Sequence, residues 1–306
     1  MDQFLQQLIN GLALGSIYAL IALGYTMVYG VLRFINFAHG DVFMLGAYVG
    51  LYSGRYISGK LQAEPSVLLA VSVLAISMAI CAIVGVVIER LAYAPLRSRP
   101  RLTVLITAIG VSLFLEYGGQ QFFGAGPHFF EPILPSYEVH TGALKITSNQ
   151  LVVLSVTIVL LVGLTFVVLK TKMGTAMRAL SFNPTAASLM GINNNVIISF
   201  TFGLGSALAA AAGILWAINY PSINPLMGLL PGIKAFVAAV LGGIGNIPGA
   251  ALGGLILGVT ETLVVGYSDR LHIPPSYRDA VAFVVLIVIL LFKPSGLLGK
   301  SSSEKV

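Results

Sequence analysis

Charge is scarce in this sequence. Only 9% of its 306 residues are charged, whereas about 25% are charged in an average soluble protein. Hydrophobic residues make up 57% of the chain, and its mean hydropathy is +0.93. So few polar side chains cannot cover a globule of this size in water, and a disordered chain would need low hydrophobicity. The composition therefore excludes a soluble enzyme and a disordered protein, and it predicts an all-α, polytopic integral membrane protein.

Groups that carry chemistry in other proteins are also missing. The single cysteine, Cys81, excludes a disulfide within the chain and a cysteine-based metal site. Gly299-Lys300-Ser301 resembles the end of a phosphate-binding loop, but Pro294 stands where an earlier glycine is required. The chain lacks the His-Glu-x-x-His pattern, and its net charge of +6 comes without basic clusters interleaved with aromatic residues. We therefore expect no enzyme activity, no cofactor, no metal and no nucleic-acid partner.

Long apolar stretches dominate what is present. A helix that crosses a hydrocarbon core of about 30 Å needs roughly 20 apolar residues. Charge-free stretches, divided by Gly and Pro, predict eight or nine transmembrane helices, some of them short or broken. The second, seventh and ninth are short for a full crossing. The predicted segments are residues 4–31, 37–54, 66–88, 102–123, 150–169, 196–219, 230–245, 249–267 and 279–293.

The basic residues divide unevenly between the two sides of this predicted bundle. If nine segments alternate in direction, one side receives many more Lys and Arg residues than the other. By the positive-inside rule the richer side is cytoplasmic, which predicts a periplasmic N-terminus and a cytoplasmic C-terminus. The richer side holds Arg33, Arg90, Arg97, Arg99, Arg101, Lys170, Lys172, Arg178, Lys293, Lys300 and Lys305, and the other holds Arg55, Lys60, Lys145, Arg270 and Arg278.

A polar stretch separates the first two apolar segments. Asn36, His39 and Asp41 occur where one segment ends and the next begins, with no loop long enough to leave the membrane comfortably. A helix that starts there points unpaired N–H groups and the positive end of its dipole into the protein. Capping by Asn36 or Asp41 would explain two of these residues, but it does not explain His39. We expect the three side chains to line or gate a pathway.

A second interruption is rich in glycine. Gly242, Gly243, Gly245 and Gly249 break an apolar stretch, and further glycines at four-residue spacing follow, which permits close helix packing. A tight turn with a packing face accounts for most of them. Interrupted hydrophobic segments in both halves of a transporter also point to a site or gate at mid-membrane. Gly245 and Asn246 are therefore candidate pathway residues.

Three further ionisable residues fall inside predicted segments. Such residues are costly in a membrane, so each is a functional candidate by default. Glu116 and Glu261 have the structural alternative of a helix end or a polar neighbour within the bundle. Lys234 has the alternative of extending its side chain to the outer interface. The residues alone do not decide between these readings.

Several motifs occur together along the chain. They are Asn10–Leu20, Gly24–Gly30, Ile35–Asp41, Glu89–Tyr93, Leu189–Asn193, Lys234–Phe236 and Gly245–Ala250. This combination resembles the LivH family, the branched-chain amino-acid permeases of bacterial ABC importers. The resemblance runs essentially from end to end, and the combination is far more specific than any one motif.

The resemblance implies a fold and partners. It implies a single transmembrane permease domain over residues 1–306, with a fold similar to that of the ribose importer permeases, in the bacterial inner membrane. Such a subunit works in the lipid bilayer with a second related permease, two cytoplasmic ATP-binding subunits and a periplasmic substrate-binding protein. The imported substrates would be leucine, isoleucine and valine, and ATP would be hydrolysed by the partner subunits.

The resemblance also implies a cytoplasmic coupling loop within residues 170–195. There, Pro184, Ala186, Ala187 and Gly191 match the loop through which such permeases contact their ATPases. Ala187 and Gly191 are four residues apart and are expected to share one face of a short helix. The family's loop often begins with an acid, and Asn183-Pro184-Thr185 has none, so no charged contact is expected at that position.

Two other functions stay open at this point. Within the same family, the substrate could be urea or a short amide. In a different class, the chain could be a self-sufficient secondary amino-acid transporter driven by H⁺ or Na⁺, with Asp41, Glu116 and Glu261 as ion-coupling residues. An importer permease needs a docking loop and partners, whereas a secondary transporter works alone.

Overall fold

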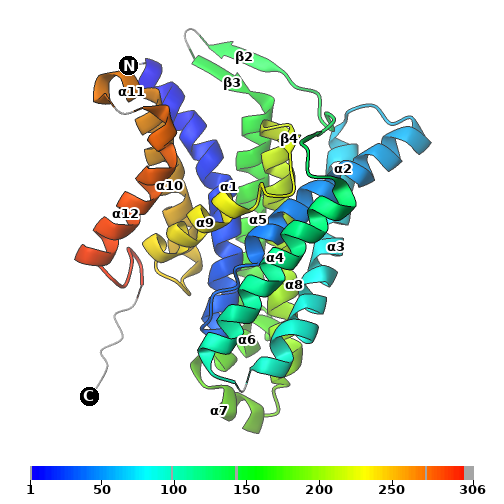
Figure 1. Ribbon diagram of the computed structural model, residues 1–306, viewed down its shortest axis with the longest axis vertical. Coiled ribbons are helices and arrows are strands. Elements are labelled where there is room, and N and C mark those ends of the chain that lie inside the picture. The colour runs from blue at the N-terminus through cyan, green and yellow to red at the C-terminus, as the bar shows by residue number, and fades with distance from the viewer. Residues whose placement is uncertain (1, 98, 142–143, 273, 300–306) are drawn as a thin grey trace.

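The fold is a helical bundle whose two ends differ. The computed structural model describes residues 2–97, 99–141, 144–272 and 274–299. We call one end the hairpin end, because it holds the strands β2 and β3 and the start of α1, and the other the α7 end, because α6 and α7 project from it (Figure 1). The helices are α1 (Asp2–Leu32), α2 (His39–Leu61), α3 (Val67–Ile88), α4 (Arg101–Phe123), α5 (Ser148–Lys170), α6 (Lys172–Phe182), α7 (Pro184–Leu189), α8 (Asn194–Asn219), α9 (Leu229–Gly242), α10 (Ile247–Gly266), α11 (Ser268–Leu271) and α12 (Arg278–Phe292).

The all-α polytopic architecture predicted from composition is confirmed. Seven helices among the described residues are long and apolar enough to cross a membrane, and α9 is a shorter apolar helix. Each of the nine predicted segments corresponds to one helix of the bundle, and their boundaries agree within a few residues except that α2 continues to Leu61. Side-chain caps define where several helices begin. The Ser66 side chain caps α3, and Thr147 forms a capping box with Gln150 at α5.

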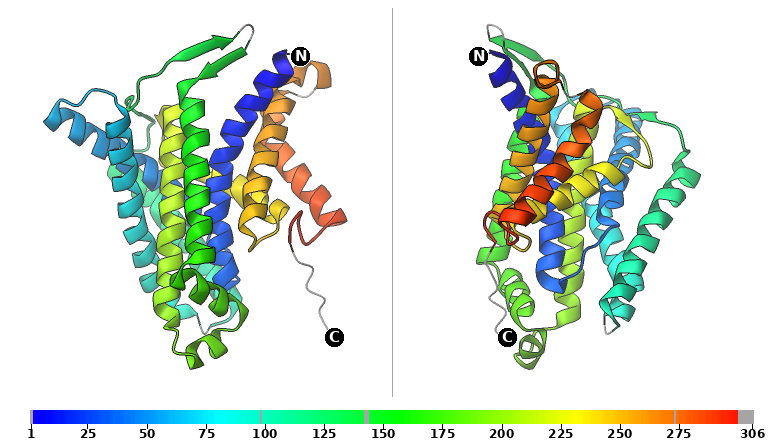
Figure 2. Two further views of the ribbon diagram at one scale, coloured as in Figure 1. Left: turned by 180° about the vertical axis from the view of Figure 1, so that it is seen from behind. Right: turned by 60° about the vertical axis from the view of Figure 1, so that its left-hand side comes forward.

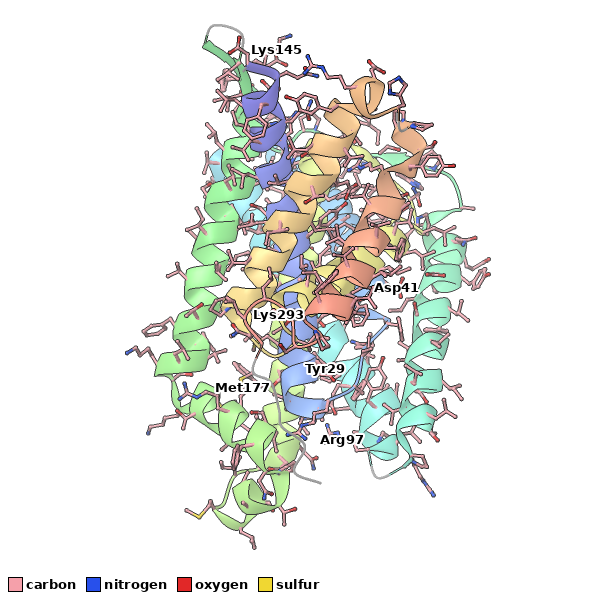
Figure 3. All side chains as sticks on the ribbon, turned by 90° about the vertical axis from the view of Figure 1, so that its left-hand side faces the viewer. Tyr29, Asp41, Arg97, Lys145, Met177 and Lys293 are labelled. Atoms are coloured by element: carbon pink, nitrogen blue, oxygen red, sulfur yellow. The ribbon has the colours of Figure 1, made fainter. Side chains whose placement is uncertain are left out.

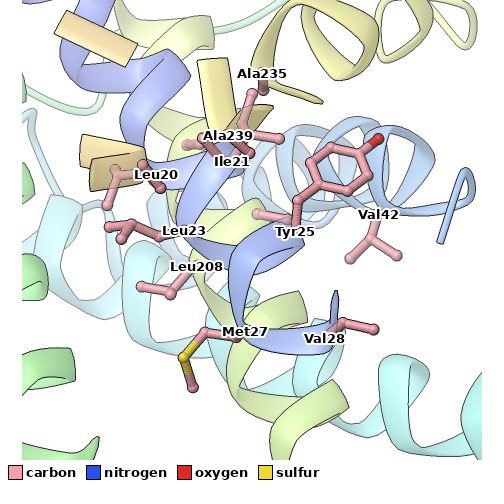
Figure 4. Close-up of a cluster of buried hydrophobic side chains, with 14 of the residues drawn as sticks. Leu20, Ile21, Leu23, Tyr25, Met27, Val28, Val42, Leu208, Ala235 and Ala239 are labelled. Atoms are coloured by element: carbon pink, nitrogen blue, oxygen red, sulfur yellow. The ribbon is translucent and has the colours of Figure 1, made fainter. Parts of the chain in front are cut away.

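Two helices, α1 and α8, form the centre of the bundle. α1 packs against α5, α8, α9 and α10, and α8 packs against α1, α2 and α3. The core around α1 is made mainly of small and aliphatic side chains from four helices, together with Tyr25 and Met27 (Figure 4). By contrast, the spans formed by α3, α4, α5 and α12 expose most of their apolar side chains, which suits helices that face lipid. The core residues drawn in Figure 4 include Leu20, Ile21, Leu23, Tyr25, Met27 and Val28 of α1, Val42 of α2, Leu208 of α8, and Ala235 and Ala239 of α9.

Glycines set the close approach between α1 and α10, as the four-residue spacing predicts. A methyl group added at Gly258 would overlap the backbone of Gly15, and one added at Gly254 would overlap the backbone of Ala19. The same holds between α9 and α10, where Gly253 faces the backbone of Ala238. Small residues let two backbones approach closely in a membrane, where lipid is as apolar as the helices and packing provides much of the attraction.

Two helices, α2 and α9, do not run from one end of the bundle to the other. α2 begins at mid-bundle and runs to the hairpin end, and α9 lies obliquely across the bundle (Figure 2). At 14 residues, α9 is about 21 Å long at 1.5 Å per residue. It is therefore too short for a hydrocarbon core of about 30 Å. The seventh segment is therefore short, as expected, whereas the second, α2, has 23 residues and is not short.

Short strands close the hairpin end. β2 (Glu138–Thr141) pairs antiparallel with β3 (Leu144–Thr147), with Glu138 opposite Thr147. β1 (His128–Phe129) pairs antiparallel with β4 (Ser222–Ile223), which ties the segment after α4 to the segment after α8. At the α7 end, α3 continues through a π-helical turn, Glu89–Tyr93, into a single 3₁₀ turn.

Candidate functional site

The start of α2 lies deep within the bundle. The Nε2 atom of His39 is 3.2 Å from the carbonyl oxygen of Ile21. Ile21 is eleven residues before the end of α1 at Leu32, and at 1.5 Å per residue this is about 16 Å along the helix. Asn36, His39 and Asp41 are all buried. The chain therefore turns back after α1 and starts α2 well inside the bundle, at the level of Ile21.

Simple capping does not account for these polar residues. The N-cap position of α2 is Ala38, and no side chain accepts a hydrogen bond there. Asn36 instead accepts a 2.6 Å hydrogen bond from the Tyr93 hydroxyl. The His39 ring packs edge-on against Tyr25, with 4.7 Å between centroids. The structure thus directs the side chains of Asn36 and His39 to different neighbouring elements and not to one shared cavity.

Asp41 faces α4, the helix that stands apart at the edge of the bundle. Its Oδ2 atom accepts a 2.5 Å hydrogen bond from the Ser112 hydroxyl. Glu116 follows Ser112 by one helical turn and therefore lies on the same face of α4. Both carboxyl groups are buried, and Asp41 lies beside Gly40, where α2 contacts Gly228 of the segment leading into α9. In the view of Figure 3, Asp41 appears between α12 and α4.

Lys234 and Glu261 form a buried ionic network near the hairpin end. The Lys234 Nζ atom lies 2.7 Å from a carboxylate oxygen of Glu261 and 2.5 Å from one of Asp279. Arg278 also pairs with Glu261, and the Tyr18 hydroxyl donates to it over 3.1 Å. Lys234 is only 4% exposed, so its side chain does not extend to the outer interface. Two cations and two anions balance here and join α1, α9, α10 and α12.

The glycine-rich interruption lies beside the end of α1, away from the start of α2. Gly245 is close to Gly30 near the end of α1, and the Asn246 side chain accepts a hydrogen bond from the Gly249 N–H. The Asn246 amide also donates to the Leu298 carbonyl over 2.8 Å. Both polar atoms of Asn246 are therefore engaged in shaping the turn between α9 and α10. Gly245 lines a cavity described below.

The predicted coupling loop forms two short helices that project from the α7 end. Pro184 begins α7, the Asn183 side chain accepts from the Ala186 N–H, and Pro184 and Ala186 are exposed. Ala187, however, is buried. The expectation of one helix face shared by Ala187 and Gly191 is not met, because α7 ends at Leu189. Gly191 follows in a left-handed turn with φ of +82°.

The exposed surface of this element includes large apolar side chains among its polar ones. Three large side chains beside α7 are more than four-fifths exposed, although they lie outside the lipid-facing spans. They are Phe182 at 88%, Leu189 at 81% and Met190 at 83%. We call these three residues the α7 knob. Sequence reasoning concentrated on the small residues of the loop and missed the knob, whose hydrophobicity in a polar loop was the available signal.

A second buried ion pair at the α7 end also escaped sequence reasoning. Arg97 pairs with Glu89, which is fully buried and accepts a 2.6 Å hydrogen bond from the Ser199 hydroxyl. Arg97 also donates to the Asn195 side chain over 2.6 Å. These contacts join the end of α3 to the start of α8. Among the described residues, no group of three or more His, Cys, Asp or Glu side chains is placed to hold a metal ion.

Comparison with known proteins gives a near-full-length match. Residues 7–290 match the family described as "Branched-chain amino acid transport system / permease component". The chain is 44% identical to the high-affinity branched-chain amino acid transport system permease protein BraD of Pseudomonas aeruginosa, over 99% of this chain and 98% of BraD. It is 43% identical to the corresponding protein LivH of Escherichia coli, over the same shares. A probable LivH of Methanocaldococcus jannaschii is 30% identical over 93% of this chain and 89% of its own length.

Proposed function

The chain belongs to the family of branched-chain amino acid transport permeases, and from this we propose that it is the membrane-spanning permease subunit of an ATP-driven importer of leucine, isoleucine and valine. The near-full-length match to relatives named as high-affinity branched-chain amino acid transport permeases carries the proposal. The chain contains no phosphate-binding loop. ATP hydrolysis is therefore assigned to separate subunits.

The proposed assembly has four kinds of component, of which the two permeases lie in the bacterial inner membrane. This chain pairs with a second related permease, two cytoplasmic ATP-binding subunits bind the α7 end, and a periplasmic binding protein delivers substrate at the hairpin end. The α7 knob supports the second of these contacts, because an exposed apolar cluster on a short helix suits insertion into a groove of a partner.

The proposed orientation places the α7 end in the cytoplasm. Arg90, Arg99, Lys170, Lys172 and Arg178 lie at that end, which agrees with the positive-inside rule. A cysteine at Ser188 in a Cys81→Ala background should resist a membrane-impermeant maleimide in intact cells, whereas one at Ser136 should react. The reverse pattern would overturn the orientation.

The pathway is proposed to pass the face where Asp41, Ser112 and Glu116 meet. Asp41 is the member of the predicted set whose side chain reaches that face. Asn36 and His39 would act from behind it, by holding the start of α2 against Tyr93 and Tyr25. Gly245 and Asn246 would hold the turn at the cytoplasmic side.

The substrate is tested by competition. Proteoliposomes that contain the complete complex and luminal ATP should take up labelled leucine, and excess valine or isoleucine should suppress that uptake. Excess urea or acetamide should leave it unchanged. Suppression by urea or acetamide, without suppression by valine, would assign the chain to a urea or short-amide importer instead.

A further inference from the structure

A pair of adjoining cavities opens at the α7 end of the bundle, away from the Asp41 face. One has a volume of about 360 Å³ and the other about 490 Å³, within the range of about 300–1,000 Å³ typical of ligand pockets. They lie between the end of α1, the end of α5, the middle of α6 and the turn from α9 to α10. The walls that both cavities share are Val168, Arg178, Ile244, Gly245 and Ile247.

The cavities lie at the level where lipid headgroups would be. α10 begins at Ile247 and α12 ends at Phe292, so both neighbouring spans stop at this level. α10 has 20 residues, which at 1.5 Å per residue give about 30 Å, the thickness of the hydrocarbon core. α6 and α7 project beyond this level. Figure 3 shows Met177 on α6 and Tyr29 on α1, which line the first cavity, near the α7 end of the bundle.

Two arginines line the first cavity and have neutral partners. Arg33 donates to the Ser181 carbonyl over 3.3 Å. Arg178 donates to the Leu169 carbonyl over 3.4 Å and to the Thr175 hydroxyl over 3.3 Å. Within the described ranges, neither arginine forms an ion pair with a carboxylate, and Glu89, the acid at this end, is already paired with Arg97. The cavity therefore carries two positive charges that no acidic side chain in the described part of the chain neutralises.

The remaining wall is partly apolar: beside the polar residues Thr26, Tyr29 and Ser181 of the first cavity and Thr165 and Asn246 of the second, it has a continuous set of aliphatic side chains. Val31, Met177 and Ile244 line the first cavity, and Leu169 and Pro248 line the second. A ligand that fits both properties has an anionic group for the arginines and an apolar part for α5 and the α9–α10 turn. Arg binds phosphate well, because its planar guanidinium presents several N–H donors to the phosphate oxygens. Basic pockets between membrane helices on the cytoplasmic side suit anionic lipid headgroups.

We propose that this cavity binds an anionic phospholipid, with the phosphate between Arg33 and Arg178 and the acyl chains along the α5 wall. The site would join three segments that have no covalent link nearby. Arg33 begins the return from α1 to α2, Arg178 lies on the helix that carries α7, and Gly245 is in the turn between α9 and α10. A bound lipid would therefore hold the α7 element against the ends of α1 and α10.

Lipid binding to the purified full-length chain tests this proposal directly, without any transport reaction. The protein in detergent is titrated with phosphatidylglycerol or phosphatidylcholine, and bound lipids are counted by native mass spectrometry. Phosphatidylglycerol should bind at least about tenfold more tightly. Arg33→Gln and Arg178→Gln should each weaken its binding about tenfold, the effect of losing a hydrogen bond to a charged group.

Arg99→Gln is the matched control, because Arg99 is exposed at the same end of the bundle and does not line either cavity. It should bind phosphatidylglycerol like the parent protein. Arg178→Lys keeps the charge, so it should bind more tightly than Arg178→Gln and serves if the glutamine variant aggregates. Equal binding of the two lipids by the parent protein, or parent-like binding by both glutamine variants, would overturn the proposal. Displacement of the lipid by millimolar inorganic phosphate would also overturn it, in favour of a site for a free anion.

Discussion

Burial makes Glu261 the critical residue of the network at the hairpin end. Its carboxylate is fully buried and pairs with Lys234 and Arg278, whereas the Asp279 side chain is 44% exposed. Glu261→Gln leaves two cations facing one partly exposed anion. Removing one partner of a buried pair costs about 3–5 kcal/mol. We therefore expect this variant to lose about that much free energy of unfolding, measured by denaturant titration in mixed micelles.

Asp279→Asn is the comparison for that measurement. Water screens a half-exposed carboxylate, so its loss should cost about 1 kcal/mol or less. Equal losses for the two variants would show that burial does not set the strength of this network. The sequence could not rank these two acids, because the rank depends on how deeply α10 and α12 bury them.

We expect the charge of Asp41 to contribute to transport. Asp41→Asn keeps the shape of the side chain and its contact with Ser112, but it removes the charge from the face shared with α4. A hydrogen bond from a passing substrate to a charged group contributes about 1.5–3 kcal/mol, so without the charge uptake should fall about tenfold or more. The amount of folded protein should be unchanged, because the contact with Ser112 is kept. Leucine uptake by the reconstituted complex measures this effect. Unchanged uptake would restrict Asp41 to a packing role.

At the scale of elements, the approach of α10 to α1 depends on glycine. Gly258→Ala places a methyl group against the backbone of Gly15, which cannot move aside without separating the helices. Overpacking of this kind costs about 1–3 kcal/mol. Gly110→Ala on α4 meets nothing within 4 Å, and it should stabilise the helix by about 0.5–1 kcal/mol. Thermal unfolding of both variants in detergent gives the comparison, and a stabilising Gly258→Ala would contradict the packing described here.

The positions of the helices along the chain were predictable from the sequence, whereas their packing and orientation in the bundle were less so. Apolar runs and Gly or Pro breaks located all nine segments, because helix length in a membrane is a local property. The oblique course of α9 was not predictable, since it depends on the contacts of Lys234 with α10 and α12. The burial of Ala187 was not predictable either, because small residues suit both a partner contact and a packed interior.

We expect the α7 knob to contribute to binding of the ATP-binding subunits. Leu189→Asp changes an exposed side chain of the α7 knob and should leave the bundle folded. It should reduce the recovery of ATP-binding subunits in co-purification, since a charge would replace an apolar contact. Tyr137→Asp, at an exposed position near the hairpin end, should recover them fully.

Leu189 is a better site for this test than Gly191. Gly191 has open space around it, but its positive φ strains any side chain placed there. An effect of a Gly191 substitution would therefore mix backbone strain with the loss of a partner contact. Full recovery of the ATP-binding subunits by Leu189→Asp, with normal uptake, would contradict the assignment of the knob.

At the scale of the whole molecule, the two ends of the bundle differ in their balance of basic and acidic residues. Arg55, Lys60 and Lys145 at the hairpin end lie among acids such as Glu131, which pairs with Arg55. Cations at the α7 end outnumber acids, and the buried Glu89 is occupied by Arg97. By the positive-inside rule this asymmetry supports the proposed orientation, and it also provides cations that can attract anionic lipid.

The central claim is that this chain is a permease subunit of an ATP-driven importer. Identifying the energy source of uptake tests this claim most directly. The complete complex is reconstituted in proteoliposomes beside liposomes that hold this chain alone, and uptake of labelled leucine is measured with luminal ATP or with an imposed H⁺ or Na⁺ gradient. The account predicts uptake by the complete complex with ATP, unaffected by ionophores that dissipate both gradients, and no uptake by the chain alone. Gradient-driven uptake by the chain alone, abolished by the ionophores, would contradict the account and identify a secondary transporter.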